Sequence, residues 1–224
     1  WEKVDHDKFM GSQAKVVSEE EFRKWTRSLR DQYGVLEDDL RFSVDPKLDG
    51  VDLSLQYRDG ILAHAVTRGD GVQGEDILRN AIVMRHVPFR AGKSSLTVRG
   101  QMMISKPRFD ELRELNLDYK NARNACAGIC RRLNRENSNF IDFIAFDCFG
   151  GDADMLYTEQ GKHEWLKNHD FKPIKRSSNL TVDEVTALFG VYRDGMREKL
   201  VYEIDGLVIR IENVFIQEKL GDKS

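Results

Sequence analysis

Residues 51–66 carry the strongest structural signal in the sequence. Apolar and polar side chains alternate over residues 51–57, an Asp-Gly pair follows at 59–60, and an apolar run returns over 61–66. Alternation with a period of two is typical of a β-strand, and an Asp-Gly pair between two such runs favours a tight turn. These residues therefore predict a β-hairpin.

Residues 18–33 predict an amphipathic helix. Ser18 and Glu21 form a capping-box pattern at its start, and Gly34 provides a stop signal. Four large side chains fall mostly on one face at helical spacing: Phe22, Trp25, Leu29 and Tyr33. A stripe of this kind packs against a core more often than it binds a ligand.

The remaining elements mix helices and strands. Further helices are predicted through about Met84, from Pro107, and over residues 119–133, 158–170 and 181–196, the last with Thr181 and Glu184 as a capping box. Further strands are predicted over residues 96–104, 140–149 and 202–212, the last interrupted at Asp205-Gly206, and a flexible loop over 150–157. The order has no regular strand–helix–strand repeat, which favours an α+β fold with mainly antiparallel sheets.

The composition is that of a soluble globular protein. Of 224 residues, 40% are hydrophobic and 33% are charged, and no run of about 18 apolar residues predicts a membrane span. The net charge is −3, so any contact with nucleic acid must come from a local patch. The best candidate is the run 120–135, with Lys120, Arg123, Arg131, Arg132 and Arg135. A solvated helix face is the alternative interpretation of this run.

Three cysteines, Cys126, Cys130 and Cys148, include no CxxC pair. This pattern argues against a disulfide framework and against a structural zinc site, and it fits a reducing intracellular compartment. Cys126 and Cys130 lie four residues apart in a predicted helix, so we expect them to pack in the core.

Residues 47–50 read Lys-Leu-Asp-Gly and stand at the mouth of the predicted hairpin. A lysine amine attacks phosphorus only in its neutral form, which burial or nearby positive charge favours. Asp45 and Asp49 favour the charged form, and a bound Mg²⁺ would offset them while neutralising a phosphate under attack. The tetrapeptide alone is more often an ordinary turn lysine than a nucleophile.

Further sequence blocks accompany this tetrapeptide. They are DPKLDG (45–50), TRGDGVQGED (67–76), VRGQMMISKPRFDEL (98–112), NARNACAGICRRL (121–133) and EIDGLVIRIE (203–212). In order and spacing over residues 42–221 they resemble the adenylation domain of NAD-dependent DNA ligases. The resemblance implies a nucleotidyltransferase (ATP-grasp-like ligase) core of mainly antiparallel sheets with flanking helices.

The resemblance implies a three-step reaction. Lys47 looks like the nucleophile that attacks the α-phosphate of NAD, expels nicotinamide mononucleotide and becomes lysyl-AMP. The AMP then passes to the 5′-phosphate of nicked duplex DNA, and the 3′-hydroxyl displaces it to seal the break. The cofactors implied are NAD and Mg²⁺, and the processes implied are DNA repair and replication in the cytoplasm, at a nucleoid or a viral replication site.

The resemblance also assigns roles by position. The catalytic residues implied are Lys47, Asp49, Arg68 and Asp205. The nucleotide-binding residues implied are Asp45, Leu48, Gly50, Gln101, Phe146 and Arg210. Arg123 and Arg131 match arginines that serve the transfer step or the DNA, and Asp205 is the residue expected to take part in metal and phosphate chemistry. Arg68 and Arg210 provide permanent cations, and the glycines at 69, 71 and 74 allow tight turns near a substrate.

Three positions depart from the family pattern. Gln101 stands where the family has a glutamate that holds a ribose hydroxyl; an amide oxygen still accepts this hydrogen bond but without charge. Arg210 replaces a lysine, which keeps the charge but exchanges a compact ammonium for a planar fork. Phe146 replaces a tyrosine and keeps a ring that can stack, without its hydroxyl.

Residues 1–40 form an expected N-terminal helical segment that could be a remnant of the nicotinamide-binding module, and residues 41–224 an adenylation domain truncated at its C-terminus. His6 is either part of that remnant or a surface histidine. The partners implied are nicked DNA and either the missing C-terminal ligase modules or a second subunit, and no membrane. Two alternatives stay open: an ATP-dependent DNA or RNA ligase core, and a catalytically degenerate ligase-like domain that binds nucleic acid.

Overall fold

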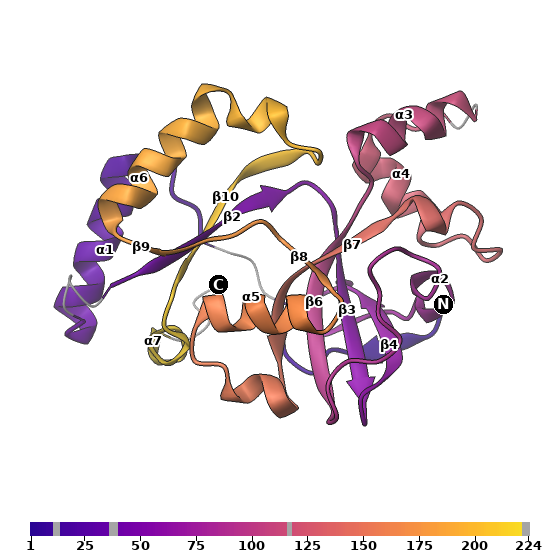
Figure 1. The fold of residues 1–224 in the computed structure, drawn as a ribbon, viewed down its shortest axis with the longest axis horizontal. Helices are drawn as coiled ribbons and strands as arrows, with labels where there is room; N and C mark the ends of the chain where they lie inside the picture. Colours follow the sequence, from indigo (N-terminus) through magenta and orange to yellow (C-terminus); the bar gives the residue numbers. More distant parts are fainter. Residues whose placement is uncertain (11–13, 36–39, 116–117, 221–224) are drawn as a thin grey trace.

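Two β-sheets lie next to each other in the computed structural model, with helices packed around them (Figure 1). The structure describes residues 1–10, 14–35, 40–115 and 118–220. The strands are β1 (Lys3–Asp5), β2 (Phe42–Leu48), β3 (Val51–Arg58), β4 (Ile61–Thr67), β5 (Gln73–Glu75), β6 (Leu96–Met103), β7 (Asp142–Phe149), β8 (Lys172–Pro173), β9 (Ser177–Leu180) and β10 (Ile204–Ile211). One sheet has the strand order β4-β3-β6-β7-β8, the other has the order β10-β2-β9, and β1 pairs with β5.

Each sheet has its own apolar core and its own helices. The helices are α1 (Glu19–Tyr33), α2 (Leu78–Ala81), α3 (Lys106–Glu114), α4 (Ala122–Ile129), α5 (Glu159–Asn168), α6 (Val182–Val191) and α7 (Val214–Leu220). Side chains of α1 and α6 pack with Phe42, Val44 and Ile211 of the three-stranded sheet, and Figure 1 shows both helices at that end of the molecule. Side chains of α2, α4 and α5 join the core of the five-stranded sheet. Within the described ranges, none of these helices is long and apolar enough to cross a membrane.

The expected α+β class with mainly antiparallel sheets is confirmed. The long strand pairs β2–β10, β3–β4, β3–β6 and β6–β7 are antiparallel. The short pair β7–β8 is parallel. The interruption predicted at Asp205-Gly206 is a register shift between Ile204 and Gly206, where β10 pairs with the end of β2.

The predicted hairpin is formed by β3 and β4, with a turn at Asp59 and Gly60. Both turn residues have positive φ, at 50° and 72°, and a Cβ atom on Gly60 would lie 2.7 Å from the carbonyl oxygen of Gly92. The polar side chains Ser54 and Gln56 are buried as well as the apolar ones. The N-terminal segment covers this face, because Gln56 Nε2 donates to the carbonyl oxygen of Asp5 at 2.8 Å.

The Lys-Leu-Asp-Gly motif connects the two sheets. Lys47 and Leu48 end β2 in the three-stranded sheet, and Val51 begins β3 in the five-stranded sheet. The lysine therefore lies on the strand before the hairpin, in a different sheet, which the sequence pattern did not predict. A Cβ atom on Gly50 would lie 2.7 Å from the carbonyl oxygen of Met102, so this crossing needs a glycine for close approach.

The two predicted capping boxes differ in the structure. Thr181 and Glu184 form the complete capping box of α6. Ser18 accepts from the amide of Glu21 at 3.1 Å, but the Glu21 carboxylate accepts from Val17 rather than from Ser18. Of the predicted stripe on α1, Phe22, Trp25 and Leu29 pack in the core, and the side chain of Tyr33 lies outside the described residues.

Several predicted helices are shorter than expected. The helix over 181–196 loses regular geometry after Val191, because Gly195 has a φ of 124°. The helix over 119–133 is reduced to α4, which Asn121 caps by accepting from the amide of Asn124. The helix through Met84 is the single turn α2, and the predicted loop over 150–157 contains a short 3₁₀ helix, Gly151–Met155.

The cysteines pack in the core as expected. Cys126, Cys130 and Cys148 are free and buried. Burial raises the pKa of the Cys130 thiol to about 11, so the reactive thiolate is disfavoured at neutral pH.

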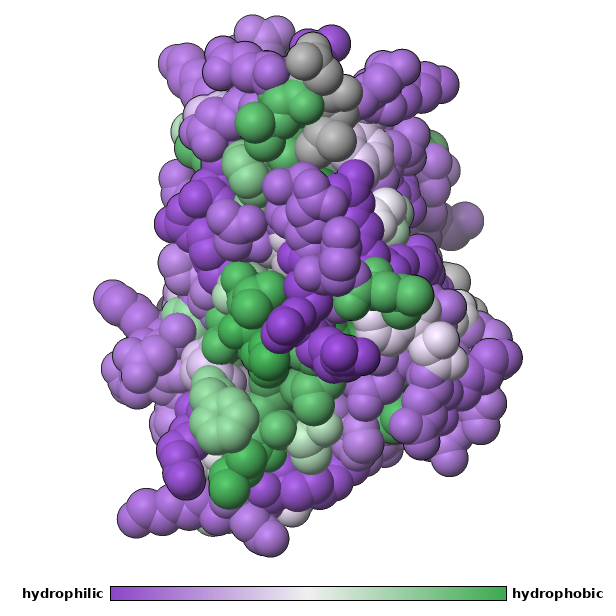
Figure 2. All heavy atoms as spheres, turned by 90° about the vertical axis from the view of Figure 1, so that its right-hand side faces the viewer, coloured by the Kyte–Doolittle hydropathy of each residue, from purple (hydrophilic) through white to green (hydrophobic). Residues whose placement is uncertain are grey.

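One face of the molecule carries a cluster of apolar side chains. Figure 2 shows it in green, surrounded by hydrophilic side chains, on the side that lies to the right in Figure 1. In the chain after α2, Ile82, Val83 and Phe89 are exposed, and residues 86–90 with Asp170 line an open hollow of about 420 Å³.

The stability of the fold is expected to decrease between pH 7.5 and pH 5.5. Burial lowers the pKa of His86 and of His163, helped by Lys172 near the first and Arg176 near the second. Below pH 6.5 the unfolded chain binds protons that the folded histidines do not, so the free energy of unfolding falls as the pH falls. Urea midpoints at the two pH values test this. The double variant His86→Gln/His163→Gln should show a smaller change, and an unchanged wild-type midpoint would contradict the prediction.

Candidate functional site: a lysine between two sheets

The amine of Lys47 is paired with Asp205. Lys47 lies opposite Gly206 in the β2–β10 pair, next to the register shift, and its Nζ is 2.8 Å from both carboxylate oxygens of Asp205. Both side chains are close to half exposed, at 45% and 47%, so a substrate can reach the amine. The structure thus brings together two predicted catalytic residues that are 158 positions apart in the sequence.

The other acidic residues near the motif have arginine partners. Asp49 accepts from Arg123 at 2.9 Å, and Asp45 accepts from both Arg176 and Arg210. The two carboxylates expected to favour a charged amine are therefore occupied elsewhere. Among the contacts of the described residues, Asp205 is the carboxylate that contacts the amine.

A second group of predicted residues lies on the five-stranded sheet. Gln101 is opposite Asp52 in the β3–β6 pair and donates from Nε2 to that carboxylate at 2.9 Å. Arg68, directly after β4, lies 3.7 Å from the same carboxylate. Asp52 therefore orients both Gln101 and Arg68, and sequence reasoning missed it.

Gln101 has a buried acceptor that no side chain or backbone group satisfies. Its Oε1 has no hydrogen-bond partner among the described residues. The Asp52 carboxylate can only accept hydrogen bonds, so the Nε2 end of the Gln101 amide must face Asp52. The Oε1 end therefore faces away from Asp52. An unsatisfied buried acceptor costs about 1–3 kcal/mol, so this oxygen is ready for a donor such as a ribose hydroxyl.

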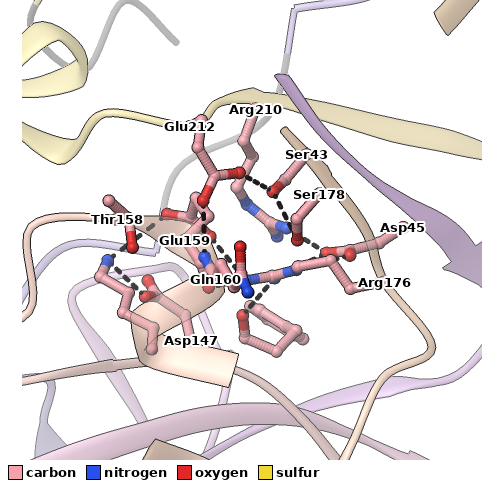
Figure 3. A network of polar contacts seen from close by, with 12 residues as sticks. Ser43, Asp45, Asp147, Thr158, Glu159, Gln160, Arg176, Ser178, Arg210 and Glu212 are labelled. Atoms are coloured by element: carbon pink, nitrogen blue, oxygen red, sulfur yellow. Dashed lines mark hydrogen bonds and ion pairs between the residues drawn. The ribbon is translucent and has the colours of Figure 1, made fainter. Parts of the chain in front are cut away.

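Three predicted nucleotide-binding residues form one contact group. The guanidinium of Arg210 binds Asp45 and lies over the ring of Phe146, 5.6 Å from its centroid. Asp45 is 1% exposed. Figure 3 shows Asp45 from β2 and Arg210 from β10 converging on a network of polar side chains. Leu48 and Gly50 lie at the crossing between the sheets, where Leu48 packs with Met103 and Ile144.

The arginines assigned to DNA or the transfer step lie near the Gly-rich loop and the motif. Arg123 is 57% exposed beside Asp49, and Arg131 pairs with Glu75 at 2.6 Å. Asp49, Gly50 and Arg123 also line a cavity of about 60 Å³ between α4 and the end of β6. Arg132 pairs with Glu136 at 3.4 Å, so the basic run is only partly available to a phosphate backbone.

His6 contacts backbone carbonyl oxygens of the Gly-rich loop. Its Nε2 lies 3.1 Å from the carbonyl oxygen of Arg68, and its amide donates to Val72 at 2.8 Å. The N-terminal segment is thus attached next to Arg68. The interpretation as a nicotinamide-site remnant stays a hypothesis.

Sequence reasoning also missed a buried network of charges behind Asp45. Its members beyond the predicted ones are Asp147, Glu159, Lys162, Arg176 and Glu212. Burial alone would lower the pKa of Lys162, but Asp147 and Glu159 raise it to about 12. Burial alone would raise the pKa of Asp147, but Lys162 brings it below its ordinary value. A charged residue type ordinarily predicts exposure, so no local signal marked these positions.

Two sheets that enclose a lysine, an acid and several arginines define the fold of a ligase nucleotidyltransferase core. A solved structure titled "Pmar-Lig_Pre." shares this fold, with a TM-score of 0.50 and 12% identity over 77% of this chain and 39% of that one. The family model described as "NAD-dependent DNA ligase adenylation domain" matches residues 1–224. The chain therefore belongs to the family of NAD-dependent DNA ligase adenylation domains.

Curated relatives agree with this assignment. The "DNA ligase" of Pseudomonas syringae pv. tomato is 34% identical over 238 residues, which cover 97% of this chain and 30% of that protein. The "DNA ligase" of Bacillus subtilis is 30% identical over 99% of this chain and 34% of that protein. The chain thus spans about a third of the length of these relatives.

Proposed function

We propose that this chain is the adenylating unit of an NAD-dependent DNA ligase, with Lys47 as the residue that accepts AMP. The observation that carries the proposal is the contact of Lys47 Nζ with both oxygens of Asp205 at 2.8 Å. It lies where two sheets meet, and Gly50 of the same motif packs against residues 101–103 of the other sheet. The family match supports NAD over ATP as the nucleotide.

Asp205 is positioned to act as the base for the attack. A group that abstracts a proton must lie within about 2.6–3.2 Å of the donor atom, and Asp205 meets this condition. The ammonium of Lys47 transfers one proton to Asp205, and the neutral amine that results attacks the α-phosphorus of NAD and releases a second proton to solvent. The new P–N bond forms as the bond from that phosphorus to the bridging oxygen breaks, and nicotinamide mononucleotide leaves with the bond electrons.

The nucleotide site combines one open acceptor with several cations. Oε1 of Gln101 accepts from a ribose hydroxyl, and Phe146 offers a ring beneath the nucleoside. Arg68 and Arg210 provide charge for the phosphates, and Arg123 provides charge beside the motif. These permanent cations stabilise the negative charge that develops in phosphoryl transfer.

The residues present fit one Mg²⁺ shared with a substrate phosphate. The described residues contain no group of three or more His, Cys, Asp or Glu side chains that could hold a metal by themselves. Mg²⁺ in nucleotide enzymes is commonly held by one or two carboxylates together with substrate phosphates and water, and Asp205 is the half-exposed carboxylate next to the amine. When bound there, Mg²⁺ would neutralise phosphate charge and weaken the hold of Asp205 on Lys47.

The later steps involve DNA and other parts of a ligase. In this proposal lysyl-AMP passes its AMP to the 5′-phosphate of nicked duplex DNA, and the 3′-hydroxyl then displaces AMP. The DNA backbone would contact Arg123 and those basic side chains near α4 that are not occupied by an acidic partner. The partners proposed are nicked DNA and further ligase modules or a second subunit, at the sites of replication and repair in the cytoplasm.

Mass spectrometry tests the proposal directly. The complete protein is incubated with Mg²⁺ and either NAD or ATP, and its intact mass is measured. We expect one added AMP with NAD, mapped to the peptide that contains Lys47, and its removal when nicotinamide mononucleotide is added in excess. An adduct with ATP alone would instead support an ATP-dependent ligase, and no adduct with either nucleotide would support a domain that binds without turnover.

A further inference from the structure

Arg176 uses its whole hydrogen-bonding capacity inside the protein. It lies between β8 and β9, where the chain passes from the five-stranded to the three-stranded sheet. Its side chain is 1% exposed. A guanidinium has five N–H donors, and five hydrogen bonds of 2.8–2.9 Å lead from Arg176 to both oxygens of Asp45, the carbonyl oxygen of Phe146, and the carbonyl and carboxylate oxygens of Glu159.

These acceptors belong to three elements from both sheets. Asp45 lies on β2 of the three-stranded sheet, and Phe146 lies on β7 of the five-stranded sheet. Glu159 begins α5, which packs on the five-stranded sheet through Leu166. Figure 3 shows the guanidinium of Arg176 between Asp45 and Glu159. One side chain therefore joins the two sheets across their boundary.

Arg176 is linked to Lys47 through Asp45 on strand β2. Asp45 and Lys47 are two residues apart on β2, so they share a face and lie about 7 Å apart along the strand. On the other side, β7 pairs with β6, which carries Gln101. The position of Arg176 thus determines how far β2, with Lys47, stands from the strand that carries the unsatisfied oxygen of Gln101.

Arg176 also closes a ring of contacts with the cation at 210. Asp45 binds both arginines. The carbonyl oxygen of Phe146 accepts a hydrogen bond from Arg176, and the guanidinium of Arg210 lies over the Phe146 ring. The Asp45 carboxylate is therefore a shared counter-ion of two arginines.

We propose that Arg176 is a positioning residue for adenylyl transfer, which holds the two sheets so that Lys47 faces a nucleotide bound at Gln101 and Phe146. This inference rests on the proposed function. Among the contacts of the described residues, Arg176 touches neither the amine of Lys47 nor the side-chain amide of Gln101, and it acts through Asp45 and the strands. Correct placement of reacting groups contributes large rate factors, and misplacement by about 1 Å costs on the order of 100-fold.

The variant Arg176→Lys tests the proposal in the complete protein. Lysine keeps the charge but has three donors on one nitrogen, so it cannot reach all five acceptors. We expect the single-turnover rate of AMP transfer at saturating NAD to fall about 10- to 100-fold, in line with the cost of misplacement. The NAD concentration at half-maximal rate should change less than about threefold, because the groups that contact the nucleotide are retained.

Lys162→Gln is the matched control. Lys162 is a buried cation of the same network, but its partners Asp147 and Glu159 both lie on the side of the five-stranded sheet. We expect this variant to lower the melting temperature and to keep the wild-type transfer rate at a temperature where it is folded. An equal loss of rate in Arg176→Lys and Lys162→Gln would reduce Arg176 to a structural role and overturn the inference.

A base analogue separates positioning from base recognition. Deamino-NAD carries a carbonyl group in place of the adenine amino group. Arg176→Lys should leave the ratio of transfer rates for NAD and deamino-NAD unchanged, and a changed ratio would mean that the Arg176–Asp45 pair reads the base. If Arg176→Lys does not fold, Asp45→Asn weakens the same link and should lower the rate in the same way. If wild-type protein forms no adduct, the proposed function itself fails; if it does and Arg176→Lys transfers at the wild-type rate, only this inference fails.

Discussion

We expect Lys47→Arg to abolish the AMP adduct while leaving the fold intact. Arginine keeps a permanent positive charge and can form a bidentate pair with Asp205, so the link between β2 and β10 is retained. A guanidinium does not lose its proton in proteins and is no nucleophile. The adduct measured by intact mass with NAD and Mg²⁺ should fall below detection, a loss of more than about 10⁴-fold, the scale observed when a covalent nucleophile is removed.

Lys106→Arg provides the matched control for this substitution. Lys106 pairs with Glu203, two residues before Asp205, at 3.5 Å, and its side chain is 35% exposed. The same change of an ammonium to a guanidinium there should leave the adduct at its wild-type level and the melting temperature close to the wild-type value. An adduct that persists in Lys47→Arg, or that maps to another lysine, would show that Lys47 is not the acceptor.

Local signals predicted the parts of the fold that neighbouring residues determine. The Asp59-Gly60 turn and the Thr181–Glu184 capping box each depend on residues within a few positions of one another, and both are confirmed. The sheet arrangement was not predicted, because β2 pairs with β10 from more than 150 residues away and with β9. Alternation identifies a strand but does not name its partner.

At the candidate site too, the sequence identified residues but not their contacts in the tertiary structure. The resemblance identified Lys47, Asp205 and Gln101 by position, but which acid contacts the amine depends on tertiary structure. Asp45 and Asp49 are nearer in the sequence to Lys47 than Asp205 is, and both are paired with arginines instead. Arg176 was missed altogether, because its five acceptors come from segments that are 17 to 131 residues away.

We expect Arg176→Met to destabilise the fold strongly. Methionine fills a similar volume but removes the Arg176 cation from Asp45 and Glu159, each 1% exposed, so that Arg210 and Lys162 are their remaining cationic partners among these contacts. Removing one partner of a buried ion pair typically costs about 3–5 kcal/mol, because the remaining charge stays buried. Domains are stable by only about 5–15 kcal/mol, so urea unfolding should show a large fall in the midpoint.

A double variant separates two causes of the lost stability: the removal of a cation from the buried carboxylates, and the loss of packing. In the double variant Arg176→Met/Glu159→Gln, one of the two carboxylates that lose Arg176 becomes a neutral amide that can still accept the hydrogen bond from Gln217. The double variant should therefore be more stable than the sum of the two single changes predicts, since the two residues share one network. The exposed pair Arg193–Asp194 supplies the control, because Arg193→Met should leave the midpoint unchanged. If Arg176→Met lowers the midpoint no more than Arg193→Met does, the five hydrogen bonds of Arg176 do not hold the two sheets together.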